Sequence, residues 1–345
     1  MRRPAVTPDR IVAVAALVLA VLAPLYLSTY WVGQLLTQML FLGIAAASLI
    51  FLSAYGGMVS LAQVSIFGIA GFALGNATTT GNTKGLNLGW NPWWGVVVGI
   101  AIAVATALLF GALASRSVGI YFLMITLTYS VIANLFFGQV TTVSGFGGIS
   151  GIPTPEGVGN TDAHPNRLYY IALVVALVVY ALLRYVSGTP FGLSLQGVRD
   201  DPVRMASLGY RPALHRTLAF TFAGFIAAVA GVLFVWWNGH IDPASIGLGA
   251  TIDLLVIAVV GGLYRLEGAW VGALFFVVIN NYSQRIGFIG PRFHTLIGAI
   301  FLLIIVASPG GLVGLWERMV DLFSGRRRDP LDRGPVELGQ AEPSV

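Results

Sequence analysis

The chain has 345 residues, of which 57% are hydrophobic and 10% charged, and its mean hydropathy is +0.83. This composition excludes a soluble enzyme. The basic residues, which give a formal net charge of +5, lie between apolar runs, and this placement excludes a nucleic-acid-binding protein. Because there is no cysteine and the four histidines fall in four separate segments, the sequence also predicts no metal site.

The apolar runs predict an all-α, polytopic integral membrane helical bundle. Most are about 17 to 25 residues long, which is the length that a helix needs to cross a hydrocarbon core of about 30 Å. Helices are favoured because backbone amides find no water inside lipid. We predict about ten spans within residues 11–308. They are Ile11–Leu27, Gly33–Ala54, Met58–Thr78, Trp93–Ala114, Val118–Gly138, Leu168–Ser187, Thr217–Trp237, Gly247–Gly262, Gly268–Gln284 and Phe293–Ser308.

The first and third spans each have an alternative interpretation. Residues 1–10 and the apolar run after them resemble a signal peptide, but the many later spans favour an uncleaved first helix. The third span is rich in glycine and alanine and carries Ser60, Gln63 and Ser65, so a broken or re-entrant helix is the alternative there.

The basic residues predict the orientation of the bundle. Lysine and arginine segregate to cytoplasmic loops, and with the N-terminus inside only four of the 19 fall on external loops: Lys84, Arg167, Arg285 and Arg292. This imbalance predicts an even number of spans and places both termini in the cytoplasm. Residues 1–10 and 309–345 are then cytoplasmic, the second segment being an interfacial helix followed by a disordered tail.

Two loops are long. Residues 139–167 form an external loop whose stretch SGFGGISGIPTPEGVGN predicts irregular turns. Residues 188–216 form a cytoplasmic loop that concentrates charge in VRDDPVRMASLGYRPALHR.

The cytoplasmic loop predicts a short helix from Pro202 to Leu208. Asp201 can cap its start and Gly209 can close its end. Asp200 lies four residues before Arg204, a spacing that favours an ion pair. Because so short a helix is marginal in water, we expect it to dock against a partner surface. The alternative is an ordinary solvated loop that its arginines keep inside.

Small and polar residues within the spans have both a packing and a functional interpretation. The many glycines favour close helix packing, while the pairs Gly56, Gly57 and Gly261, Gly262 are candidate hinges or marks of an internal repeat. Polar side chains in spans either bridge helices or line a substrate pathway. The candidates for the pathway are Gln63, Ser65, Thr126, Asn134 and Asp253.

The sequence places any energy source elsewhere. Lys84 is the only lysine, and it lies in an external loop outside any G-x-x-x-x-G-K-[ST] phosphate-binding motif. If ATP drives transport, a separate protein must bind it. An ion-coupled secondary transporter is the alternative, with Asp253 as its intramembrane ionisable group.

From about Tyr30 to Leu315 the chain resembles the LivM-type permease subunits of branched-chain amino-acid ABC importers. The resemblance rests on the order and spacing of six stretches: YGGMVSLAQVSIFGIAGF, GIYFLMITLTYSVI, GGISGIP, FGLSLQGVRDDPVRMASLGY, VIAVVGGLYRLEGAWVGA and SPGGLVGL.

The resemblance implies a multi-pass permease in the bacterial inner membrane that has no enzymatic activity and no cofactor of its own. Its implied partners are a second permease of the LivH type, two ATP-binding subunits that hold ATP and Mg, an extracytoplasmic solute-binding protein and the lipid bilayer.

The charged cytoplasmic loop resembles the EAA loop, whose short helix docks onto the ATPase subunit. The matching positions are Arg199, Asp200, Asp201, Pro202, Arg204, Ala206, Leu208 and Gly209. Met205, Ala206 and Ser207 occupy the neighbourhood of the motif's glutamate.

The scarcity of charge inside the spans limits the cargo. A zwitterion with an apolar side chain, such as Leu, Ile or Val, can cross a lightly polar path, whereas a phosphorylated solute would need basic residues that the spans lack. Urea, short amides and other neutral amino acids remain compatible alternatives.

Overall fold

A computed structural model describes residues 18–80, 85–158 and 165–283, together with 295, 298, 299, 302 and 310–315. Residues 18–26 are helical and belong to the first predicted span. The predicted tail, the start of the first span and most of the tenth span, Phe293–Ser308, lie outside the described residues.

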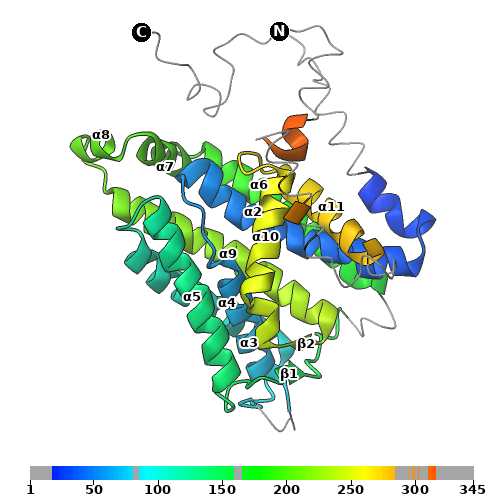
Figure 1. Cartoon of the computed structure of the whole chain (residues 1–345). Helices are drawn as coiled ribbons and strands as arrows, with labels where there is room; N and C mark the ends of the chain where they lie inside the picture. Colours follow the sequence, from blue (N-terminus) through cyan, green and yellow to red (C-terminus); the bar gives the residue numbers. More distant parts are fainter. Residues whose placement is uncertain are drawn as a thin grey trace, which may run out of the picture.

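The chain is a helical bundle, as predicted (Figure 1). A π-helical segment, η1 (Trp31–Leu36), leads directly into α2 (Thr37–Gly56). The remaining long elements are α3 (Gln63–Thr78), α4 (Pro92–Ala114), α5 (Ile120–Gln139), α6 (Pro165–Gly188), α9 (Pro212–Asn238), α10 (Leu248–Gly261) and α11 (Gly268–Ser283). Short elements complete it: β1 (Ile149–Ser150), α7 (Pro190–Asp200), α8 (Pro202–Ser207), β2 (His240–Ile241) and η2 (Pro243–Ile246).

Five helical segments in the described residues are long and apolar enough to cross a membrane: Trp31–Gly56, α4, α5, Asn166–Gly188 in α6, and α9. Helices α10 and α11 are apolar but shorter. Proline at the first helical position starts α6 at Pro165 and α9 at Pro212, three and five residues before the predicted spans begin.

The third predicted span is broken. Helix α2 ends at Gly57, whose φ of 62° is left-handed, and the chain then runs without helix from residue 58 to the start of α3 at Gln63. The prediction of a continuous span from Met58 is therefore wrong over its first five residues, and the alternative of a broken helix is the one observed. The 16 residues of α3 extend about 24 Å at 1.5 Å per residue, which is less than a hydrocarbon core of about 30 Å.

Helices α3, α4 and α9 pack closely because small residues line their contacts. The buried face of α4 carries a small residue at every fourth position, namely Gly95, Gly99, Ala103, Ala107 and Gly111. A methyl group at Gly231 of α9 would overlap the main-chain carbonyl of Phe67 in α3. The packing interpretation of the glycines is confirmed at these contacts, where backbones approach directly.

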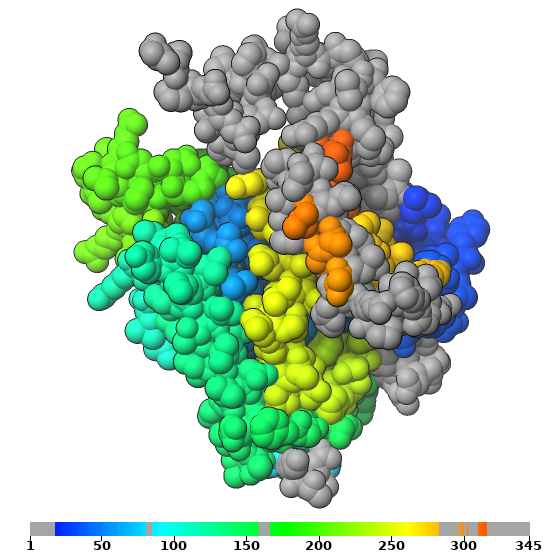
Figure 2. Space-filling model, viewed as in Figure 1, coloured from blue at the N-terminus to red at the C-terminus, as the bar shows by residue number. Residues whose placement is uncertain are grey.

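The outer faces of α4, α5 and α6 are apolar and exposed. Trp94, Leu109 and Tyr121 are examples, with Tyr121 70% exposed. Figure 2 shows α5 and α10 side by side on one such face. Helices that cross a membrane form their backbone hydrogen bonds internally and present apolar side chains to lipid. These exposed apolar faces are therefore typical of a multi-pass membrane protein.

The two ends of the bundle differ. At one end β1 and β2 pair antiparallel, Ile149 opposite Ile241, so the expected irregular loop 139–167 contains a short strand. At the other end lie Gly56, the α4–α5 turn, the connection from α6 to α9, and the α10–α11 turn; we call this the α8 end (Figure 1).

Candidate functional site

The α8 end carries the charged connection that the sequence singles out. Thr189 accepts a hydrogen bond from the Gly192 amide and Pro190 follows it, so this pair begins α7. The sequence prediction omitted α7, although a Thr-Pro pair is a recognisable start signal. Helix α7 packs against α2, α6 and α9, and α8 projects beyond it in Figure 1.

The predicted helix from Pro202 is confirmed, and it ends at Ser207, one residue earlier than expected. The Asp201 carboxylate accepts hydrogen bonds from the amides of Val203 (3.1 Å) and Arg204 (2.9 Å). At the other end Gly209 has a φ of 92°, and its amide bonds Ala206 O while the Tyr210 amide bonds Met205 O. These two bonds form a Schellman motif, which favours glycine at the left-handed position.

The predicted ion pair between Asp200 and Arg204 is wrong. Asp200 Oδ1 instead accepts from Arg199 Nε at 2.8 Å, and Arg199 Nη1 also donates to the main-chain oxygen of Ala54. The spacing rule fails because Asp200 ends α7, Asp201 is extended and Arg204 lies in the next helix, so the two residues do not share one helix face. Arg199 therefore joins α7 to the end of α2.

Three apolar side chains of α8 and its C-cap are exposed. Val203 is 79% exposed and Leu208 66%, and Ala206 is exposed beside them. Met205 points inward, where a methyl group at Gly197 of α7 would lie 2.8 Å from its sulfur. Helix α8 is thus fixed on its inner side by Met205, while Val203, Ala206 and Leu208 are exposed around the rest of its surface.

The paired glycines end two helices at the α8 end. Gly57 and Gly262 are the positive-φ residues that follow α2 and α10, at 62° and 123°. A methyl group at Gly57 would lie 2.6 Å from the Arg199 side chain, and one at Gly261 would overlap the main chain of Gly268. Their place at helix ends is as predicted, whereas the hinge and the internal repeat stay predictions.

The structure gathers three of the five pathway candidates around the start of α3. Gln63 Oε1 accepts from Ser48 Oγ at 3.3 Å, and Thr126 Oγ1 of α5 accepts from the Leu61 amide at 3.2 Å. Ser65 lies in the first turn of α3 and bonds Ala62 O. All these polar side chains are buried. Ser48 was not predicted, because nothing in the sequence marks it as a neighbour of Gln63.

The start of α3 has uncompensated hydrogen-bond donors. Gln63 Nε2 is buried and has no hydrogen-bond partner among the described residues. No side chain there caps the first turn of α3, whose first amides lack partners within the helix. Because these amides form the positive end of the helix dipole, the site favours an anionic or strongly accepting group.

The other two candidates lie elsewhere. Asn134 Nδ2 donates to Pro243 O at 2.6 Å, and Asp253 lies in the second turn of α10. Thr126, Ser130 and Asn134 are spaced four residues apart on α5, and Ser130 bonds Thr251 of α10 at 3.0 Å. This stripe bridges helices, and its spacing could have revealed Ser130 from the sequence. No group of three potential metal ligands occurs within the part of the chain that the structure describes.

Comparisons with known proteins extend over most of the chain. Residues 31–306 match the model of a family described as the permease component of branched-chain amino acid transport systems. LivM of Salmonella typhimurium, a high-affinity branched-chain amino acid transport system permease protein, is 24% identical over 244 residues, which cover 62% of this chain and 55% of that protein.

Two further relatives show the same pattern. LivM of Escherichia coli is 24% identical over 241 residues, which cover 61% of this chain and 54% of the relative. LivH of Salmonella typhimurium is 29% identical over 146 residues, which cover 42% of this chain and 46% of the relative. The chain thus spans about half the length of the curated relatives it matches. No solved structure matches it significantly.

Proposed function

Because the chain belongs to the family of branched-chain amino acid transport permeases, we propose that it is the membrane-spanning subunit of an ATP-binding-cassette importer for Leu, Ile and Val. It resides in a bacterial inner membrane and pairs with a second, LivH-type permease, in line with its similarity to both LivM and LivH proteins. Two separate ATP-binding subunits carry ATP and Mg, and a solute-binding protein delivers the amino acid.

The α8 end faces the cytoplasm in this proposal. Support comes from the arginines that gather there, which are Arg116, Arg184, Arg199, Arg204, Arg211, Arg216 and Arg265. The opposite end carries tryptophans, and Trp93 contacts Trp236 there with ring centroids 6.2 Å apart. Basic residues favour the cytoplasmic side, and tryptophan favours a membrane interface. The solute-binding protein then docks at the β1–β2 end.

The observation that carries the proposal is α8 itself, a short helix that is capped at both ends and exposes apolar side chains. An ATPase subunit encloses α8 in a groove and contacts Val203, Ala206 and Leu208. Movement of α8 passes to α7 through Met205 and Gly197, and from α7 to α2 through Arg199. Helix α2 is followed by residues 58–62, which lead to α3. Closure of the ATPase subunits therefore moves the buried polar side chains at the start of α3.

The start of α3 forms the substrate pathway with Gln63, Ser65 and Thr126, and Asn134 and Asp253 line it further along. The uncapped amides of α3 and the Gln63 amide suit the carboxylate of an amino acid, as at discontinuous helices of other transporters. The apolar surroundings suit its aliphatic side chain.

The test is uptake of radiolabelled L-leucine into proteoliposomes. Vesicles holding both permeases, both ATP-binding subunits and the receptor are expected to accumulate leucine only with internal ATP, and excess urea or acetamide should not compete. Vesicles holding this chain alone should show no uptake under a proton or sodium gradient. Gradient-driven uptake would establish a secondary transporter instead.

Replacing Gln63 by leucine is expected to lower leucine uptake about tenfold or more, because the substrate loses the Nε2 donor and keeps only the main-chain amides of α3. Initial rates in the same proteoliposomes measure the effect. Thr128→Val is the control, since Thr128 lies on the exposed face of α5 and bonds only Met124 O of its own helix. Equal uptake by Gln63→Leu and the control would remove Gln63 from the pathway.

A further inference from the structure

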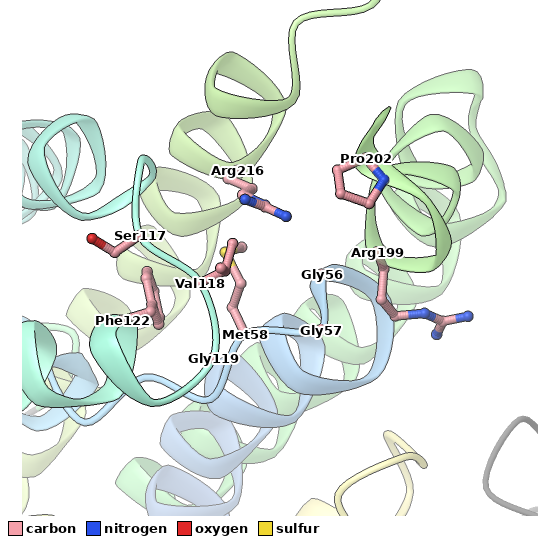
Figure 3. A pocket seen from close by; sticks show the side chains of 10 residues that line it. All are labelled: Gly56, Gly57, Met58, Ser117, Val118, Gly119, Phe122, Arg199, Pro202 and Arg216. Atoms are coloured by element: carbon pink, nitrogen blue, oxygen red, sulfur yellow. The ribbon is translucent and has the colours of Figure 1, made fainter. Parts of the chain in front are cut away.

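A pocket of about 310 Å³ lies at the α8 end, where four elements meet (Figure 3). Gly56, Gly57 and Met58 line it from the α2–α3 connection, and Ser117, Val118, Gly119 and Phe122 line it from the α4–α5 turn and the first turn of α5. Arg199 and Pro202 come from the α7–α8 junction, and Arg216 from the first turns of α9. The pocket thus touches both the candidate coupling helix and the broken segment that leads to α3.

The two arginines of the pocket differ in their partners. Arg199 is engaged by Asp200 and by the carbonyl of Ala54, and in Figure 3 its guanidinium points away from the centre. Arg216 points from α9 toward Pro202 (Figure 3). It forms no ion pair with a described residue, and its buried Nε has no hydrogen-bond partner among them. Asp201, which precedes Pro202, does not line the pocket, and its Oδ1 accepts from the first amides of α8.

Apart from the two arginines and Ser117, the lining is apolar or glycine. Met58, Val118 and Phe122 offer an apolar wall opposite a single uncompensated cation. A phosphate would require several charged donors, whereas one guanidinium matches one carboxylate. The volume is at the lower end of small-ligand sites, which suits a molecule the size of a free amino acid.

We propose that this pocket binds the carboxylate of a small apolar acid at Arg216, with the aliphatic group against Met58, Val118 and Phe122, and that its ligand is the imported amino acid on the cytoplasmic side. The choice of ligand rests on the proposed function. Because the ligand contacts Pro202 and Gly57 together, it fixes the start of α8 against the α2–α3 connection. High cytoplasmic leucine therefore restrains the movement of α8 and slows further import.

The test is equilibrium dialysis of radiolabelled L-leucine with the purified full-length chain, without receptor or ATPase. Saturable binding is expected, weakened about tenfold or more in Arg216→Gln and largely kept in Arg216→Lys. Arg184→Gln is the control, since Arg184 lies at the same end but pairs with Glu267. Leucinol, which lacks the carboxylate, and inorganic phosphate should not displace leucine.

Three outcomes overturn the proposal: the absence of saturable binding, equal binding by Arg216→Gln and the wild type, or displacement by phosphate as effective as by leucine. A monodisperse elution profile and the Arg216→Lys variant separate loss of the site from loss of folding. The assay needs no transport, so its failure differs from failure of the proposed function, which would appear as missing ATP-driven uptake.

Discussion

Gly209→Pro is expected to reduce ATP-driven leucine uptake more than tenfold while the chain still inserts into the membrane. Proline fixes φ near −65° and has no amide hydrogen, whereas Gly209 has a φ of 92° and donates to Ala206. The substitution therefore destroys the end of α8. It leaves the bundle intact, because a methyl group at Gly209 meets no atom within 4 Å.

The measurement is uptake and receptor-stimulated ATP hydrolysis in the same proteoliposomes, normalised to membrane content. ATP hydrolysis should continue without uptake, which is uncoupling. Gly209→Asn is the matched control, because asparagine tolerates the left-handed conformation and should retain most of the uptake. Reversal of Asp200 and Asp201 to lysine should also uncouple, since it removes the cap and the Arg199 pair. Normal coupling in Gly209→Pro would show that α8 transmits nothing.

Gly231→Val is expected to prevent stable folding of the bundle. The added side chain would overlap the main-chain carbonyl of Phe67, and neither backbone can move without separating α9 from α3. Overpacking typically costs about 1–3 kcal/mol, and a backbone clash at a buried interface belongs to the upper end. The yield of monodisperse protein in detergent and its thermal unfolding midpoint measure the loss.

Gly249→Val provides the comparison for this variant. Gly249 also lies in a helix, α10, but it is exposed and a methyl group there meets no atom within 4 Å. It should therefore unfold near the wild-type temperature. A wild-type unfolding midpoint for Gly231→Val would contradict the close approach of α3 and α9 at this position.

Hydropathy predicts the long helices well because their apolar length reflects a single physical requirement, the thickness of the bilayer. It fails where the chain breaks that pattern. Residues 58–62 are as apolar as a helix, yet the left-handed Gly57 ends α2 and the chain continues without helix to Gln63. Hydropathy does not reveal α7, because its 11 residues are too few to span a bilayer and carry polar as well as apolar side chains.

The sequence predicts one part of the candidate site and misses another. The part it predicts depends on residues close together in the chain, and the part it misses depends on residues far apart. Helix α8 depends on local signals at Asp201, Pro202 and Gly209, so its prediction is confirmed almost residue by residue. The meeting of Leu61 with Thr126, and of Gly57 with Arg216 in one pocket, joins residues far apart in the chain. No spacing rule within one element predicts such contacts, because they depend on how the helices pack.

The most direct test of the account uses the absence of cysteine from the chain, which makes a single Ser207→Cys variant specific for thiol labelling. Ser207 lies on α8, and a membrane-impermeant maleimide should label it in inside-out vesicles and not in intact cells. Co-expression of the ATP-binding subunits should protect it, because they cover α8. Labelling in intact cells, or equal labelling with and without those subunits, would contradict a cytoplasmic α8 that docks onto an ATPase.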